Sequence, residues 1–282
     1  MAGADVPDAL LLLYADRSDP VARAILDNPG RFEREVIALS LQQLLLEVAG
    51  GTTWKWAGRT IDPSRTAVVN RLPSLGSADV AGQPNSSFQR TQLWIWLSGE
   101  LQRFAYASSL PTASSVLGGY GSLLDQWLDM PRLVGGLRVP AHRTPWDNAM
   151  PNGDVYLVDP WQLYSLGRPI SAGPGTNAAG LAYARPAGLL VHVAQVGGTY
   201  FLANVPPGMA TVQQDYITSF ANSMARLSAS RILEHAFFVG NELPVFYATS
   251  PVPLVTGALA SYPELVIRGL CDDIRRCSRR TA

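Results

Sequence analysis

An Asn-Arg pair is the most informative polar feature of the sequence. Asn70 and Arg71 directly follow the apolar residues 67–69, which predict a buried strand. At the C-terminal end of a parallel strand, a side chain lies where open α/β sheets bind ligands. An arginine at that place can hold a carboxylate or a phosphate through two parallel hydrogen bonds. The alternative interpretation of Arg71 is a structural salt bridge.

Two further candidate pairs contain a histidine, namely His142-Arg143 and Glu234-His235. Neighbouring residues of a strand point to opposite faces, so adjacent Glu and His residues are not an obvious acid–base pair. The sequence has no HxH, HExxH or G-x-S-x-G motif, which argues against a zinc site and against a hydrolase nucleophile elbow. We therefore expect no metal site and assign no catalytic residue. The candidate ligand-binding residues are Asn70, Arg71, His142, Arg143, Glu234 and His235.

The charge balance excludes a polyanionic partner. The 22 basic and 22 acidic residues give a formal net charge of zero, so neither nucleic acid nor an acidic membrane surface is an expected partner. The apolar run at residues 9–14 is too short for a signal peptide or a membrane span, which predicts a cytoplasmic protein. Cys271 and Cys277 fit no zinc or redox spacing and are expected to be free thiols.

Strand and helix patterns alternate in the first half of the chain, which predicts a parallel sheet with helices on its faces. The strands are expected at residues 8–14, 36–39, 67–69 and 137–140, and a hairpin at 52–61. One helix is expected to begin at Asp19-Pro20, and others are expected to cover residues 41–48, 86–107 and 122–133. The helix at 86–107 is rich in tryptophan.

The composition changes near Thr144, where we place a domain boundary. Residues 165–180 are rich in Gly, Pro, Ser and Asn and predict a loop. A hairpin with its turn at Gly197-Gly198 is expected between strands 189–194 and 200–205. The remaining predictions are strands at 155–158, 232–239 and 244–247, and helices at 212–227 and 262–276.

Three of these segments resemble the ATP-grasp superfamily, in particular its RimK-like, peptide-modifying ligase branch. They are the strand end V-V-N-R at 68–71, the strand entry G-L-R-V-P at 136–140 and the hairpin around Gly197-Gly198. The resemblance covers most of the chain. It implies an α/β fold with an N-terminal Rossmann-like, pre-ATP-grasp parallel sheet over residues 1–144. A reduced ATP-grasp-like α+β domain is then expected over residues 145–282.

The sequence departs from that family at the positions that handle ATP. Such ligases neutralise phosphates with lysines and hold Mg²⁺ through a Glu-x-Asn motif on the last strand. In the matching stretch, F-Y-A-T-S-P at 246–251, Ala248 takes the Glu place and Ser250 takes the Asn place. The single lysine, Lys55, lies in the N-terminal hairpin. The short stretch between Pro140 and Leu189 predicts that most of the small ATP-covering lobe is deleted.

These departures predict a truncated, degenerate ATP-grasp-like protein without ligase activity and without a cofactor. It is expected to bind a peptide, a small carboxylated metabolite or a partner enzyme in peptide or natural-product modification. One alternative is an enzyme. It is either an ATP-dependent carboxylate–amine ligase, with ATP and Mg as cofactors, in which arginines replace the family's lysines, or a repurposed enzyme whose reshaped active site uses Arg71, His142 or Glu234. Another is a structural subunit that forms a homodimer through its Trp-rich helix. The sequence names no particular ligand.

Overall fold

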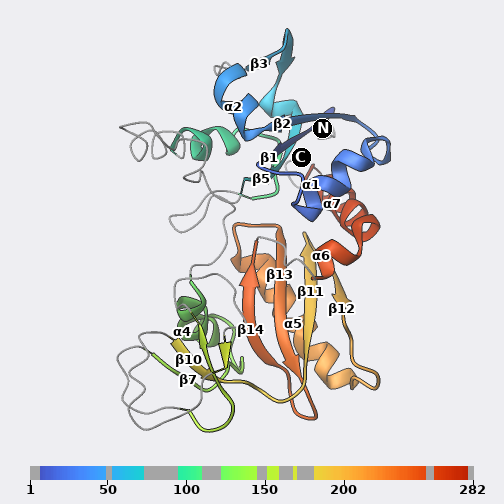
Figure 1. Cartoon of the computed structure of the whole chain (residues 1–282). Helices are drawn as coiled ribbons and strands as arrows, with labels where there is room; N and C mark the ends of the chain where they lie inside the picture. Colours follow the sequence, from blue (N-terminus) through green and yellow to red (C-terminus); the bar gives the residue numbers. More distant parts are fainter. Residues whose placement is uncertain are drawn as a thin grey trace, which may run out of the picture.

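The computed structural model describes residues 7–48, 53–72, 95–109, 122–144, 151–158, 168–169, 181–251 and 257–278. A parallel sheet formed by the N-terminal part lies at the top of Figure 1, and a large antiparallel sheet lies below it. A small antiparallel sheet lies beside the large one (Figure 1). This mixed arrangement is the α/β fold that the sequence predicts.

The N-terminal part is built on a four-stranded parallel sheet. Its order is β2 (Glu35–Ser40), β1 (Ala9–Tyr14), β5 (Thr66–Arg71) and β6 (Tyr106–Ala107). Helix α1 (Pro20–Asp27) connects β1 to β2, and α2 (Leu41–Glu47) follows β2. The interior residues of β1 are fully buried, as a continuous apolar run in a parallel sheet predicts. The predicted Rossmann-like sheet is confirmed.

Local start signals explain where the helices of this part begin. The Asp19 side chain accepts a hydrogen bond from the Ala22 amide at 2.8 Å, and Pro20 is the first residue of α1. Ser40 and Gln43 form a reciprocal capping box at the start of α2. Short 3-10 turns, η1 (Pro29–Arg31) and η2 (Pro63–Arg65), precede β2 and β5.

The region between β5 and β6 contains one confirmed and one incorrect prediction. The predicted hairpin is present as β3 (Trp54–Trp56) and β4 (Arg59–Ile61). Residues 95–101 are helical, but the predicted helix at 86–107 is wrong at its end, because residues 106–107 form strand β6. Tyr106 pairs with Ala67 of β5, so sheet pairing outweighs the local helical pattern there. Residues 86–94 lie outside the described ranges.

A small antiparallel sheet follows helix α4 (Leu123–Leu133). Its order is β7 (His142–Arg143), β10 (Leu181–Ala184), β8 (Val155–Val158) and β9 (Arg168–Pro169). The predicted strand at 137–140 is wrong, since pairing begins only at His142. Pro140 has no amide hydrogen to donate to a ladder, which accounts for the late start. The loop predicted at 165–180 contains β9, and its other residues lie outside the described ranges.

The large antiparallel sheet is the centre of the second half. Its order is β12 (Thr199–Ala203), β11 (Leu189–Val196), β13 (Ile232–Val239) and β14 (Val245–Ser250). Helix α5 (Thr211–Leu227) packs Phe220 against His235 and Phe237 on one face. Helices α6 (Ala258–Ser261) and α7 (Pro263–Ser278) pack with β11 and β12. The predicted hairpin, strands and helices of this part are confirmed within a few residues at each end.

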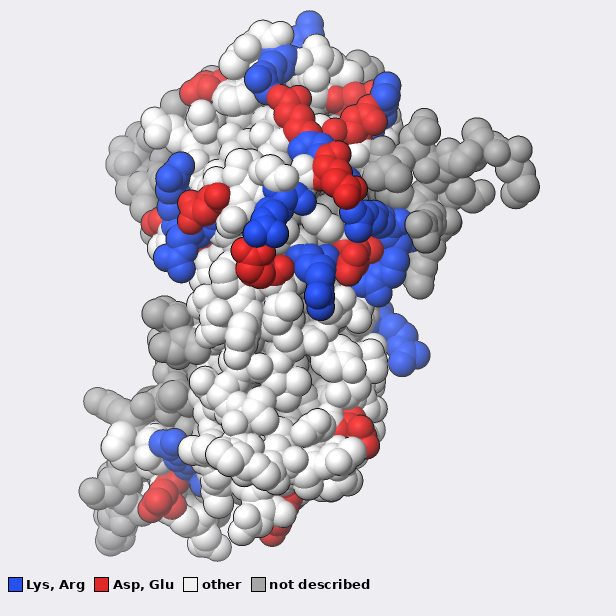
Figure 2. Space-filling model, turned by 90° about the vertical axis from the view of Figure 1, so that its right-hand side faces the viewer, with Lys and Arg blue, Asp and Glu red and all other residues white. Residues whose placement is uncertain are grey.

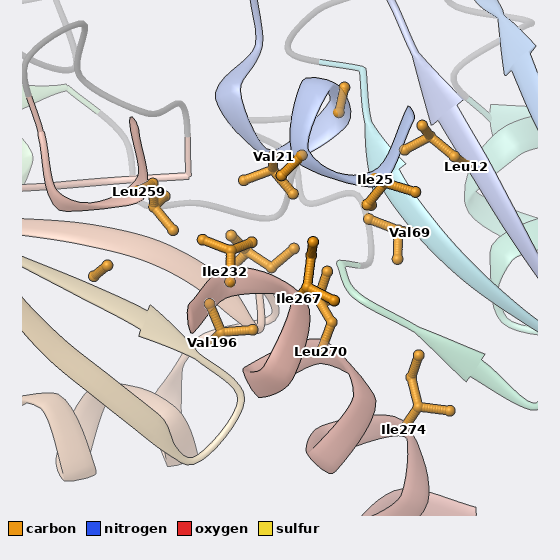
Figure 3. Close-up of a cluster of buried hydrophobic side chains, with 14 of the residues drawn as sticks. Leu12, Val21, Ile25, Val69, Val196, Ile232, Leu259, Ile267, Leu270 and Ile274 are labelled. Carbon is orange, nitrogen blue, oxygen red and sulfur yellow. The ribbon is translucent and has the colours of Figure 1, made fainter. Parts of the chain in front are cut away.

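Helix α7 links the two halves of the chain through one hydrophobic cluster (Figure 3). In it, Ile267 and Leu270 of α7 lie between Ile25 of α1 and Val196 of β11 (Figure 3). The last helix of the chain therefore packs on the N-terminal part, and the domain boundary near Thr144 stays a prediction. Of the helices in the described ranges, none combines the length and the apolar character that crossing a membrane requires.

Truncating Leu270 tests the contribution of this cluster to stability. Leu270 is fully buried, so Leu270→Ala removes buried methyl groups and leaves a cavity. We expect the free energy of unfolding in urea to fall by about 2–5 kcal/mol. Leu128, which is 44% exposed on α4, provides the control, and Leu128→Ala should change the value by less than about 0.5 kcal/mol. Equal effects of the two variants would contradict the assignment of α7 to the core.

Candidate functional site

Arg71 forms a buried ion pair that joins β5 to the start of α1. Its side chain is 1% exposed, and its Nε and Nη2 donate to the Asp19 carboxylate at 2.7–3.2 Å. The same carboxylate caps α1. Of the two interpretations of Arg71, this geometry is that of the structural salt bridge. A ligand-binding role for Arg71 stays a prediction.

Asn70 is held equally firmly. Its amide nitrogen Nδ2 donates to Ser109 Oγ at 3.1 Å, and its backbone amide donates to Ser108 Oγ at 3.0 Å. Its side-chain oxygen accepts from the Leu72 amide at 3.2 Å. These bonds attach the end of β5 to the segment after β6, so Asn70 acts as a connector in this structure.

His235 lies on the face of the large sheet that α5 covers. Its ring packs edge-on against Phe220, with centroids 5.1 Å apart, and its Nδ1 lies 2.9 Å from Thr249 Oγ1. With its amide turned by 180°, Gln195 donates to His235 Nε2 at 2.8 Å. Complete burial lowers the pKa of His235 to about 3. His235 is therefore neutral at pH 7 and enclosed by the core.

Glu234 lies on the opposite face, as alternation along a strand predicts. Its carboxylate is buried and accepts a hydrogen bond from the Ala258 amide at the start of α6. The Nδ1 atom of His192 lies 3.6 Å from the same oxygen. A Cβ atom added at Gly257 would lie only 1.9 Å from Glu234 Oε1, so glycine is required beside the carboxylate. Glu234 thus fixes the short helix α6 to the sheet.

His142 and Arg143 are the residues of strand β7 in the small sheet. The His142 ring lies 2.9 Å, through Nδ1, from the Pro140 carbonyl, and its centroid is 5.3 Å from that of Trp127. Arg143 pairs with Ala182 of β10. The six candidates therefore lie in three parts of the fold and on both faces of the large sheet, and their roles as ligand-binding residues stay predictions.

A cluster of aromatic rings, which we call the interlobe cluster, connects the small and large sheets. It consists of Trp127 of α4, Tyr183 of β10, and Phe238 and Tyr247 of β13 and β14. Neighbouring ring centroids are 5.4–5.6 Å apart, and all four side chains are buried. The Trp127 indole donates to the Tyr247 carbonyl at 2.6 Å. Aromatic packing therefore holds the two sheets together.

Comparison with known proteins gave matches only at the level of structure. No protein-family model and no curated protein sequence matches the chain. The macrocyclase MdnC of Microcystis aeruginosa MRC, bound with precursor peptide MdnA, matches with a TM-score of 0.67 and 10% identity, over 95% of this chain and 99% of that chain. The ATP-grasp ligase PsnB complexed with minimal precursor matches with a TM-score of 0.66 and 15% identity, over 96% and 99%. D-alanine–D-alanine ligase from Bacillus anthracis matches with a TM-score of 0.55 and 11% identity, over 96% of this chain and 97% of that chain.

The chain has the ATP-grasp fold. Identities this low establish the fold alone, and the match covers nearly the whole length of each of these neighbours. The predicted deletion of most of the small lobe is not confirmed, since the stretch between α4 and β11 contains a four-stranded sheet.

Ala248 and Ser250, the positions at which the ATP-grasp resemblance implies metal ligands, lie on β14. Ala248 lies opposite Ala236, and Ser250 lies opposite Glu234, across the β13–β14 ladder. Ala248 and Ser250 are 1% and 3% exposed. In the described ranges, no group of three His, Cys, Asp or Glu side chains could hold a metal ion. A methyl group and a hydroxyl thus stand at the positions where the ATP-grasp resemblance implies a carboxylate and an amide.

The interlobe cluster could not be predicted from the candidate residues of the sequence. Trp127 lies in the predicted helix at 122–133, but strand β10 was not predicted, so Tyr183 had no assigned place. The available signal was the apolar L-A-Y-A run at 181–184, which matches a short buried strand. This run lies between the predicted loop at 165–180 and the predicted strand at 189–194, in a stretch to which no element was assigned.

Two substitutions of Asp19 separate its charge from its cap. Asp19→Asn keeps a capping oxygen but leaves the buried Arg71 without a counter-charge, so we expect a loss of about 3–5 kcal/mol in the free energy of unfolding. Asp19→Ala also removes the cap and should lose about 1 kcal/mol more. Chemical denaturation at pH 7 measures both. An Asp19→Asn variant as stable as the unmodified chain would show that Arg71 does not depend on Asp19.

The pH dependence of stability tests the environment of His235. Its folded pKa is about 3, below the value of about 6.5 expected when unfolded, so the unfolded chain binds more protons between these values. As the pH is lowered below about 6.5, the free energy of unfolding should therefore decrease. This group should contribute a loss of about 2 kcal/mol between pH 7 and pH 5. His235→Gln should lack that component, whereas His142→Gln should retain it. Urea denaturation at pH 7 and pH 5 measures the difference. A His235→Gln variant that kept the full pH dependence of stability would contradict the assignment.

Proposed function

We propose that this chain is a non-catalytic member of the ATP-grasp fold that binds a peptide, or a small carboxylated ligand, as an accessory protein. Support comes from the solved structures that share its fold. Their names describe peptide modification: MdnC is a macrocyclase bound with a precursor peptide, and PsnB is a ligase complexed with a precursor. A ligase from Chryseobacterium gregarium with this fold is in complex with ADP and with a leader and core peptide.

The interlobe cluster is the observation that carries the proposal. The ATP-grasp resemblance implies that the nucleotide lies between the small and the large sheet. In this chain, the rings of Tyr183 and Tyr247 meet between these sheets, 5.4 Å apart. Trp127 closes the cluster from α4. Packed aromatic rings supply neither cations for phosphates nor hard oxygen ligands for Mg²⁺.

The residues of β14 support the same conclusion. Mg²⁺ prefers carboxylate oxygens in an octahedral arrangement, and Ala248 supplies none. Glu234, the nearest carboxylate across the ladder, accepts the Ala258 amide and lies beside His192. Moving Glu234 to a metal would leave the Ala258 amide without this acceptor. The carboxylate that could replace the missing ligand therefore already has a structural function.

Calorimetric titration with ATP and Mg²⁺ tests the proposal. We expect no binding heat and no rise in melting temperature at millimolar ATP. Binding would be detected, since a ligand present at a hundredfold excess over its Kd stabilises the folded state by about 2.7 kcal/mol. PsnB, whose structure contains Mg and ADP, is the positive control. A Mg²⁺-dependent rise would overturn the proposal and favour the alternative, an ATP-dependent ligase in which arginines replace lysines.

A matched variant identifies the cause of a negative result. Ala248→Glu with Ser250→Asn restores the ligand types implied by the resemblance but leaves the interlobe cluster in place. If the cluster alone excludes the nucleotide, this variant should also fail to bind, and only a further Tyr183→Ala substitution should permit binding. If the metal ligands are the sole deficiency, the first variant should bind.

A further inference from the structure

The two edges of the large sheet differ in how their backbone groups are satisfied. At β14, Gln126 of α4 bonds to both the amide and the carbonyl of Thr249, at 2.6 and 2.9 Å. The Trp127 indole bonds to the Tyr247 carbonyl. Pro244 and Pro251 flank this strand, and its ladder contains an irregularity. The β14 edge is thus protected by a helix, by prolines and by an irregular ladder.

Within the part of the chain that the structure describes, the β12 edge lacks a helix bonded to its backbone, a directly adjoining proline and an irregular ladder. Its pairing with β11 is regular over five consecutive residue pairs, from Val196–Thr199 to His192–Ala203. Because Val196 and Thr199 flank a two-residue turn, the backbone groups of Tyr200 and Leu202 point away from β11. Within the described ranges, no backbone hydrogen bond from another segment reaches these groups. Unpaired, regular edge groups are a template for another strand.

The surroundings of β12 lack charge. Residues 186–214 contain no Asp, Glu, Lys or Arg. Figure 2 views the side of the molecule where β12 lies, and the charged side chains gather over the upper part with a broad uncharged surface below. The nearby Val205 and Val212 are 45% and 60% exposed. Arg276, whose Nη2 lies 3.5 Å from Thr199 Oγ1, is a charged group at the end of the strand.

We propose that β12 pairs antiparallel with β12 of a second copy of this chain, so that the two large sheets form one continuous sheet. A two-fold axis beside Phe201 places Tyr200 opposite Leu202 of the partner subunit. Their outward amides and carbonyls then exchange four hydrogen bonds, two for each such pair. This inference does not depend on the proposed function.

A second copy fits this edge better than a charged peptide does. The strand T-Y-F-L-A is complementary to itself, because its aromatic and aliphatic side chains at 200 and 202 meet across the axis. The net charge is zero, so two copies do not repel each other. A charged peptide would lose its hydration against this surface without meeting an opposite charge. The homodimer that the sequence analysis assigned to the Trp-rich helix is thus placed on β12.

A pair of charge variants tests both the dimer and its register. In Y200E/L202K, each Glu lies opposite a Lys of the partner subunit, whereas in Y200K/L202K like charges face each other. Sedimentation equilibrium should give twice the chain mass of 30.4 kDa for the unmodified chain and for Y200E/L202K. Y200K/L202K should be monomeric, with a dimer dissociation constant at least about tenfold higher. Circular dichroism confirms that both variants fold.

Three results would overturn the proposal. They are an unmodified chain that stays monomeric at all concentrations, two variants that dimerise equally, and two folded variants that are both monomeric. Should the variants not fold, hydrogen exchange of the unmodified chain decides the question. The amides of Tyr200 and Leu202 should then exchange more slowly as protein concentration rises, and an exchange rate independent of concentration would contradict the pairing.

Discussion

The N-terminal sheet and the large antiparallel sheet are held together by the hydrogen bonds of one buried carboxylate, that of Asp273 on α7. It accepts the Tyr106 hydroxyl at 2.9 Å and the Arg231 guanidinium at 3.2 Å. A Cβ atom at Gly197 would lie 2.2 Å from its Cγ, so the β11–β12 turn can approach it only with glycine there. Burial, together with this carboxylate, raises the pKa of Tyr106 and keeps the hydroxyl a donor. One side chain of α7 thereby contacts β6, the residue that directly precedes β13, and the β11–β12 turn.

The hydrophobic cluster around α7 extends this anchor. It joins α1 and β1 of the parallel sheet to β11 and β13 of the large sheet. The Arg71–Asp19 pair and the Asn70 bonds lie at the end of β5, where an open α/β sheet commonly binds ligands. In this chain, these polar groups bond to one another and to neighbouring segments.

The interlobe cluster is the aromatic contact between the small and large sheets. Four aromatic rings connect the small and large sheets, and small side chains stand at the expected metal positions of β14. The backbone arrangement nevertheless matches ligases over nearly their whole length. Packing between sheets sets the fold, whereas a few side chains set the chemistry, so fold similarity alone does not establish an activity.

The sequence by itself determined the elements whose signals are local. Asp19 before Pro20, the apolar run of β1 and the Gly197-Gly198 turn each specify one element through its cap, its periodicity or its turn geometry. The alternation of elements also indicated the parallel sheet and the resemblance to the ATP-grasp fold. These features could be predicted because each depends on residues close together in the chain.

Only the tertiary structure decided the features that depend on distant residues. Tyr106 became a strand residue because β5 pairs with it, and Arg71 found Asp19 across 52 positions of sequence. The interlobe cluster brings Trp127 to Tyr247, and the two edges of the large sheet differ because α4 covers only one of them. Such contacts form when apolar surfaces leave water together, and no local pattern specifies which distant partner will be present.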